Sequence, residues 1–586
     1  MKENDAIELL LKSSCLNPSR IDFQADALEI VRELFCVPLA IDQAGAYIAS
    51  GATSIGDYLA KYLEHRKILL SHSEFTGASK YNRTEAETLR NKVLDKRNKI
   101  FGVEHPATIE AMEGLGSTYL GLGKHIEAKR LMIQVLDAKT KILGVEHSST
   151  IKAMGNLAST YYGLKRYTVA EKLEIQVLDA RIRVLGVEHP DTIHAMGNLA
   201  ATCRSLGKYT EAKKLEIQVL DARNRILGVE HPDTIHAMEN LAGTYNDLGK
   251  YTEAEKLEIL VLDARNRILG VEHPNTIRAM VILAATCRNL GKYAEVEKLE
   301  IQVLDARTRI LGVEHPNTIN AMAKLASTYY KLRKYTKAEK LEIQVLNARN
   351  RIFGVEHTDT IKAMANLAAT CSNLGKHTEA EKLEIQVLDA RNRILGVEHP
   401  DTIKAMANLA ATCRNLGKYT EAEKLEILVL DARTRILGVE HPDTIKAMAN
   451  LASTYYGWRN YTEAEKLEIQ VLNARNKILG VEHPDTIHAM ANLAATCRNM
   501  GKYTEAEKLD IQVLDMKTRI FGVEHPDTIN AMASLAVTCR KLGKYTEAER
   551  LEIQVLDARN RILGVEHLDT ISAMENLAAT CRKLEK

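Results

Sequence analysis

Bulky aromatic residues and proline are scarce in this 586-residue chain, which has one tryptophan, six phenylalanines and 11 prolines. Because proline breaks helices, its scarcity beside abundant Ala, Leu, Glu, Lys and Arg favours helix. The net charge is only +2, so no long-range field draws the whole chain to nucleic acid or to a membrane surface. Apolar residues make up 45% of the chain and charged residues 27%, a balance that indicates a packed protein and excludes a disordered one.

Long apolar runs are also missing. No stretch reaches the roughly 18 apolar residues needed to span a bilayer, and the best run, Val37 to Ala52, is broken by Asp42 and Gln43. The first residues, MKENDAIELLLKSSC, lack the basic start and apolar run of a signal peptide. These absences predict a soluble, cytoplasmic protein with no membrane partner.

The tripeptide Val-Glu-His supplies the strongest positive pattern. It occurs twelve times, from His105 to His567, always 42 residues apart and with no insertion or deletion between copies. A fixed period of this length is the signature of a solenoid, in which each unit contacts only its neighbours.

The unit from Asp401 to Pro442 predicts two antiparallel helices. Asp401 is expected to cap the first helix, and Gly417 to end it. Residues at helical spacing form one stripe that is predicted to be buried: Ile403, Met406, Leu409, Ala410 and Cys413.

The second helix of that unit is expected to start at Thr420, with Glu423 completing a capping box, and to end at Gly438. Its predicted apolar stripe comprises Ala422, Leu425, Val429, Leu430 and Ile436. One unit cannot bury both stripes alone, so units must stack into a continuous core. The sequence therefore predicts an all-α fold, a superhelical solenoid of twelve 42-residue helix-turn-helix units.

The array is expected to begin near Thr84 and to end on a first helix, Asp569 to Lys586, that no second helix follows. The apolar face of that last helix, formed by Ile571, Met574 and Leu577, would then lack a partner. Two interpretations stay open: a truncated gene product, or a site of self-association.

The repeats resemble the tetratricopeptide family, in the 42-residue form found in kinesin light chains. The resemblance covers residues 84–586 and rests on HPDT before the first helix, NLA within it, LGKYTEAE across the turn and LG after the second helix. It implies a non-enzymatic scaffold that binds proteins or peptides in a concave groove. A cargo adaptor of the kinesin-light-chain type is an alternative, although no heptad coiled coil for joining a motor is found.

Residues 1–75 resemble the helical end of an NB-ARC nucleotide-binding module, with residues 76–83 as a linker. The family's Gly-x-Pro-Leu turn reads Cys36-Val37-Pro38-Leu39 here, and no G-x-x-x-x-G-K-[ST] phosphate loop occurs. The combination resembles a NOD-like receptor of the fungal type that has lost its nucleotide-binding front. A nucleotide-regulated switch ATPase, completed by sequence upstream, is a further alternative, as is a vestigial product without a partner.

No residue pattern predicts catalysis, a cofactor or a metal site. Two packed helices separate successive Val-Glu-His histidines, so these cannot converge on one ion, and each is expected to cap its own turn. Seven cysteines share one place with tyrosines of other units, which is typical of a core filler. Glu421, Glu423 and Glu426, interleaved with Lys424, predict a solvated convex face.

The first-helix face opposite the buried stripe is the predicted binding surface. An asparagine recurs there, and an amide can donate to and accept from a peptide backbone of any sequence. Cations beside it predict extended, acidic partner segments. Nucleic acid is disfavoured because few aromatics, such as Tyr162, Tyr330 and Tyr456, are placed to stack on bases. The alternative is a copied surface without a ligand. The predicted groove residues are Asn156, Asn198, Asn240, Asn366, Asn408, Asn450, Asn492, Lys362, Lys404, Lys446, Arg278, Arg414 and Arg498.

Overall fold

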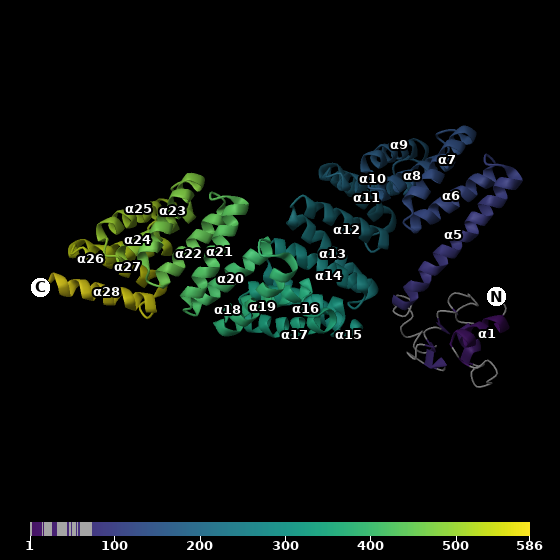
Figure 1. The fold of residues 1–586 in the computed structure, drawn as a ribbon. Coiled ribbons are helices and arrows are strands. Elements are labelled where there is room, and N and C mark those ends of the chain that lie inside the picture. The colour runs from purple at the N-terminus through teal and green to yellow at the C-terminus, as the bar shows by residue number, and fades with distance from the viewer. Residues whose placement is uncertain are drawn as a thin grey trace. The chain divides into compact units, whose positions relative to one another are not determined.

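The computed structural model describes residues 3–14, 16, 26–31, 41, 44–45, 48–49, 54–55, 57–58 and 73–585. All regular secondary structure in these residues is helical, which confirms the predicted all-α class (Figure 1). None of the described helices combines the length and the apolarity needed to cross a bilayer.

Two kinds of helix alternate along the array. The first helices of the units are α6 (Pro106–Gly121), α8 (Ser148–Gly163), α10 (Pro190–Ser205), α12 (Pro232–Asp247), α14 (Pro274–Asn289), α16 (Pro316–Lys331), α18 (Thr358–Asn373), α20 (Pro400–Asn415), α22 (Pro442–Gly457), α24 (Pro484–Asn499), α26 (Pro526–Lys541) and α28 (Leu568–Leu584). The second helices are α5 (Ser73–Phe101), α7 (His125–Leu143), α9 (Tyr167–Leu185), α11 (Tyr209–Leu227), α13 (Tyr251–Leu269), α15 (Tyr293–Leu311), α17 (Tyr335–Phe353), α19 (His377–Leu395), α21 (Tyr419–Leu437), α23 (Tyr461–Leu479), α25 (Tyr503–Phe521) and α27 (Tyr545–Leu563).

The chain divides into two compact units, Met1–Gly270 and Val271–Lys586. Within each unit every helix of the array packs against the next one along the chain, as a solenoid requires. The first unit also holds α1 (Glu3–Ser13), whose Leu10 and Leu11 lie in a small core with Ile30 and Val31.

The predicted NB-ARC-like turn, Cys36 to Leu39, lies outside the described residues. Helix α5 starts at Ser73, so residues 76–83, the expected linker, are helical. The division into residues 1–75, 76–83 and 84–586 stays a prediction.

A histidine caps every first helix from α6 to α28. In α20 the ring Nδ1 of His399 accepts a hydrogen bond from the backbone N–H of Asp401 at 3.1 Å. The prediction that each Val-Glu-His histidine caps its own turn is therefore confirmed. The prediction that Asp401 is the N-cap is wrong: Asp401 lies inside the first turn, where its charge still suits the positive end of the helix dipole.

The predicted capping box at Thr420 and Glu423 is also wrong. Helix α21 begins one residue earlier, at Tyr419, and its N-cap Lys418 makes no side-chain capping bond. The Thr420 hydroxyl donates instead to the carboxylate of the adjacent Glu421, at 2.9 Å. The start of α21 is fixed by the tight turn before it, where the Lys418 N–H donates to the Cys413 carbonyl at 2.9 Å.

That tight turn demands a left-handed residue. Gly417 occupies it at φ +75°, but three units place Lys165, Arg333 and Arg459 there, at φ +58°, +57° and +64°. A side chain in this conformation costs about 1 kcal/mol or more, since Cβ crowds the following carbonyl.

We expect Arg333→Gly to stabilise the α16–α17 region by about 1 kcal/mol, because glycine removes that crowding. Hydrogen exchange of the amides in α16 and α17 would measure the gain. The matched control is Gly417→Ala, which should lower protection in α20 and α21 by a similar amount. Unchanged or lower protection in Arg333→Gly would contradict the expectation.

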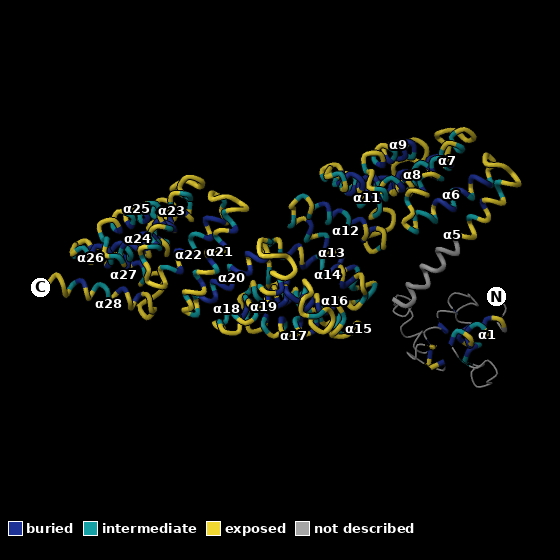
Figure 2. The backbone as a smooth tube through the Cα atoms, in the orientation of Figure 1, coloured by how far each residue is buried: buried dark blue, intermediate teal, exposed yellow. Residues whose placement is uncertain are grey.

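The apolar stripes follow the predicted pattern with one exception (Figure 2). The first-helix stripe Ile403, Met406, Leu409, Ala410 and Cys413 is buried, as predicted. In the second helix Ala422 and Val429 are buried and Leu425 and Leu430 are half-buried, but Ile436 is 49% exposed. Ile436 was wrongly placed in the core because it belongs to the last turn of α21, which extends beyond the packed part of the helix.

Candidate functional site

The predicted groove residues of α20 and α22 lie together. Lys404, Asn408 and Arg414 of α20 and Lys446 and Asn450 of α22 line one cavity of about 630 Å³. Its floor includes apolar side chains of both helix kinds, among them Ile403 and Leu437. The even spacing of 42 residues thus places equivalent side chains of successive units around a shared hollow.

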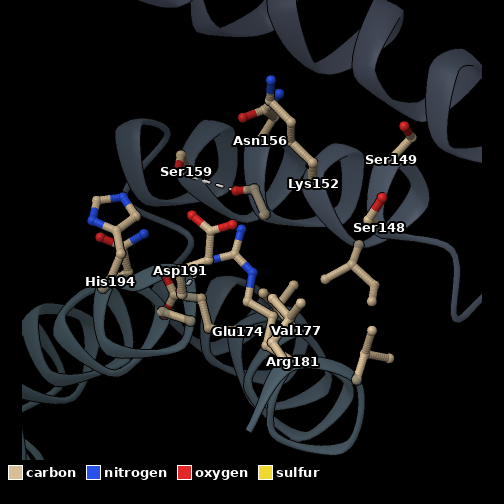
Figure 3. Close-up of a pocket in the computed structure, with 16 residues that line it drawn as sticks. Ser148, Ser149, Lys152, Asn156, Ser159, Glu174, Val177, Arg181, Asp191 and His194 are labelled. Atoms are coloured by element: carbon tan, nitrogen blue, oxygen red, sulfur yellow. Dashed lines mark hydrogen bonds between the residues drawn. The ribbon is translucent and has the colours of Figure 1, made fainter. Parts of the chain in front are cut away.

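A second cavity, of about 470 Å³, lies between α8, α9 and α10 (Figure 3). Lys152 and Asn156 of α8 face it with His194 and Asn198 of α10. Partial desolvation lowers the pKa of His194, and the cations Arg181 and Arg223 lower it further, while Asp191 and Asp233 oppose the shift.

A third cavity, of about 210 Å³, is lined by Lys446, Asn450, His488 and Asn492. The remaining predicted residues, Asn240, Arg278, Lys362 and Asn366, occupy the same register of their own first helices, where each is exposed or half-buried.

Arg414 and Arg498 belong to the predicted groove residues, and Arg414 lines the cavity, but the charges of both are engaged within the solenoid. The Arg414 guanidinium donates to Glu426 at 3.2 Å and to the carbonyl of Asn450 at 3.1 Å. That of Arg498 donates to Asp510 at 2.6 Å. Both cations are neutralised within the solenoid, so the groove is less positive than the sequence indicated.

The prediction that Glu421, Glu423 and Glu426 form a solvated face is wrong for Glu426. Glu426 is 3% exposed, whereas Glu423 is half-buried and only Glu421 is exposed. At about 100° per residue, Glu426 falls between Ala422 and Val429 on the buried side of the helix. A glutamate or aspartate is buried at this place in every second helix from α9 to α27.

Burial raises the pKa of this acid, and a hydrogen bond from a threonine hydroxyl and a nearby cation oppose the rise. Burial raises the pKa of Glu426, and Arg414 opposes the rise. The place of Arg414 is taken by Tyr162 in α8, Tyr330 in α16, Ser372 in α18 and Tyr456 in α22. Burial then raises the pKa of Glu174 and of Glu468 to about 7, with no cation among the causes to oppose it.

The unit of α6 and α7 has neither the arginine nor the acid. Leu120 stands where Arg414 would be, and Met132, which is fully buried, stands where Glu426 would be. An apolar pair thus fills the same place without charge, which shows that the fold itself does not require an acid there.

Ion pairs join neighbouring units at both ends of the helices. Lys418 lies 2.7 Å from Glu381 of the preceding unit, and Arg435 lies 2.7 Å from Glu398. The first kind recurs at Lys124, Lys208, Lys334, Lys376, Lys502 and Lys544. These pairs hold the register between adjacent units.

The cysteines are core fillers, as predicted. Six of the seven are buried, and burial raises the pKa of Cys413 to about 11, which keeps the thiol protonated. Four groups such as Glu171, Cys203 and Glu211 have ligand atoms near one another. Lys208 already neutralises Glu171 at 2.6 Å, however, so the donor set is poorly suited to a cation.

Comparison with known proteins gives one extensive match. The tetratricopeptide repeat model matches the chain in ten overlapping segments that together span residues 82–477 and 485–561. No curated protein matches the sequence.

Among solved structures, two of the nearly identical TPR-like repeats ascribed to a kinesin light chain of Podosopora anserina are each 27% identical to the chain, with TM-scores of 0.33. They cover 34% and 36% of this chain and 95% and 99% of their own. BtubC (BKLC) from P. vanneervenii is 18% identical, covers 41% of this chain and 93% of its own, and also has a TM-score of 0.33. Such TM-scores do not establish a shared overall fold, so the family is given by the repeat model.

Proposed function

Because the chain belongs to the tetratricopeptide repeat family, we propose that it is a non-enzymatic scaffold that binds extended segments of partner proteins along its first helices. The observation that carries this proposal is the cavity between α20 and α22, on which Lys404, Asn408, Lys446 and Asn450 converge. Apolar floor and polar rim are the features expected of a peptide site.

The partner segments are proposed to be acidic. Lys404 and Lys446 are exposed at the rim of the cavity, and their ammonium groups can reach a carboxylate held over it. Asn408 and Asn450 supply amides for a peptide backbone. Because Arg414 is paired with Glu426, Lys404 and Lys446 are the exposed cations that line this cavity, which makes their contribution separable by mutation.

We expect Lys404→Gln with Lys446→Gln to weaken the capture of acidic extended peptides about tenfold at low salt, because two charge contacts are lost. A peptide array probed with the full chain at two salt concentrations would measure it. Raising the salt should weaken the wild type more than the variant, since screening acts on the same charges.

The matched control is Lys382→Gln with Lys424→Gln, which removes two exposed cations from the second helices α19 and α21. Capture should stay within about twofold of the wild type in this control. Equal loss in both variants would mean that net charge, and not the cavity, governs binding. No capture of any peptide class by the wild type would overturn the proposed groove.

We also propose a cellular context and a location for this scaffold. The segment before the array supports a NOD-like-receptor context only through its resemblance to NB-ARC, and a cytoplasmic location follows from that context. A kinesin-light-chain-like adaptor is the second candidate, favoured by the 42-residue period. Self-association through α28 stays a prediction. Ile571 and Met574 of α28 are exposed, whereas the equivalent Ile403 and Met406 of α20 are buried.

A further inference from the structure

Two of the cavities contain a buried carboxylate that no cation meets. Glu174 lines the cavity between α8 and α10 and is 6% exposed, and Glu468 lines the cavity between α22 and α24 and is 8% exposed. The Oε2 atom of each has no hydrogen-bond partner among the described residues. A buried acid in this state is costly unless something else satisfies it.

In the unit of α20 and α21 an arginine of the chain meets Oε1 of the equivalent acid, Glu426, although its Oε2 also has no partner among the described residues. The Arg414 guanidinium lies 3.2 Å from Glu426, 3.1 Å from the Asn450 carbonyl and 3.4 Å from the Thr454 hydroxyl. The acceptors belong to one second helix and to the first helix of the following unit. Arg498 meets Asp510 and Thr538 in the same way, at 2.6 and 3.2 Å.

The three groups that meet Arg414 are a buried acid, an asparagine carbonyl and a threonine hydroxyl, and Glu174 belongs to an equivalent set. Shifted by the repeat, the equivalents of Asn450 and Thr454 are Asn198 and Thr202, both on α10. Asn198 lines the cavity (Figure 3 shows Glu174 and its surroundings), and the Thr202 hydroxyl faces Glu174, where a hydrogen bond to the carboxylate opposes part of the rise in its pKa. The acceptors that surround the Arg414 guanidinium therefore recur here, with Tyr162 and not an arginine at the equivalent place in the chain.

Tyr162 does not replace the arginine. Its hydroxyl lies 3.1 Å from that of Ser205, and its ring packs edge-on against Tyr167. The unit of Glu468 repeats this arrangement, since the Tyr456 hydroxyl accepts from Asn499 at 2.8 Å. Asn492 again lines the cavity, and the Thr496 hydroxyl again faces the buried acid, Glu468.

We propose that Glu174 and Glu468, each with its neighbouring asparagine carbonyl and threonine hydroxyl, bind the guanidinium of an arginine in the partner segment. This inference rests on the proposed groove and adds a requirement to it: an acidic segment with an arginine at the register of these units. Arginine suits the site better than lysine because its planar fork presents five donors to three fixed acceptors.

The charges around Glu174 leave room for an incoming cation. Lys152 of α8 is exposed, and Arg181 on α9 itself is held by the Asp191 carbonyl of α10 at 2.5 Å. His194 of α10 is exposed, and partial desolvation and two arginines lower its pKa. Burial is the main cause of the raised pKa of Glu174, and Glu171, which is paired with Lys208 at 2.6 Å, adds to the rise.

The test compares acidic peptides that carry one arginine, scanned along their length, with the same peptides carrying citrulline. The full chain should prefer arginine at certain positions by about tenfold, as one charged contact implies. Tyr162→Arg with Tyr456→Arg supplies an internal guanidinium, as Arg414 does, and should erase this preference while leaving capture of the citrulline peptides unchanged. Glu174→Gln with Glu468→Gln should erase it as well.

A pH series separates this site from the lysine-lined cavity. Because a guanidinium binds the ionised acid, the preference for arginine should grow about tenfold from pH 6 to pH 8 around a pKa near 7. Equal capture of arginine and citrulline peptides, at every position and pH, would overturn the guanidinium site and leave the groove standing. Failure to capture either kind would overturn the groove itself.

Discussion

Replacing Arg414 by alanine is expected to destabilise the α20–α22 region by about 3 kcal/mol, a large effect for a residue at the rim of a groove. Its guanidinium is the cation that meets the buried Glu426, and it also satisfies the Asn450 carbonyl. Removing it leaves a carboxylate in the core without compensation. Hydrogen exchange would localise the loss, because stability in a repeat array is regional.

The double variant Arg414→Leu with Glu426→Met tests the cause. It copies Leu120 and Met132, which fill the same place elsewhere in the chain. Protection in α20–α22 should return to within about 1 kcal/mol of the wild type, since an apolar pair of similar volume commonly replaces a buried ion pair at little cost. If the double variant loses more stability than Arg414→Ala, lost packing, and not an uncompensated charge, explains the effect of Arg414→Ala.

Glu174→Met with Glu468→Met should stabilise the free protein above pH 7, by about 2–3 kcal/mol in each region. Burial raises the pKa of both acids from 4.5 to about 7, so the folded state binds more protons than the unfolded state between these values. Wild-type stability therefore falls as the pH rises from about 4.5 to 7, and the loss is complete above 7.

Denaturant titrations read by hydrogen exchange in α9 and α23, at pH 5 and pH 8, would measure this slope. The methionine variant should lack it, and Tyr162→Arg with Tyr456→Arg should reduce it by stabilising the ionised acid. A wild type as stable at pH 8 as at pH 5 in these two helices would refute the account.

The repeat made the scaffold predictable. The spacing of Ile403, Met406 and Leu409 identified the buried stripe correctly, because a helical period averaged over twelve copies is hard to misread. Local signals were less reliable. Asp401 is the usual type of N-cap residue, but His399, one residue before Pro400, offers a ring nitrogen in the required position.

The candidate site was only half predictable for a related reason. Lys404 and Asn408 line one cavity, as helical geometry alone predicts, and their role in binding stays a prediction. The contact of Arg414 with Glu426 was not predicted, since a long side chain can turn toward a partner on another helix, here twelve residues later. The paired change to Leu120 and Met132 was the signal in the sequence that could have revealed this contact.

The ion pairs between units also bear on how the protein forms. Lys418 and Glu381 are 37 residues apart, and the hydrogen bond between Asn373 and Tyr330 spans 43. Contacts of such short sequence separation close small loops, so each of the two compact units has a low contact order for its length. Folding can then nucleate in any pair of neighbouring repeats and spread outward, and lengthening the array should add binding surface without slowing its assembly.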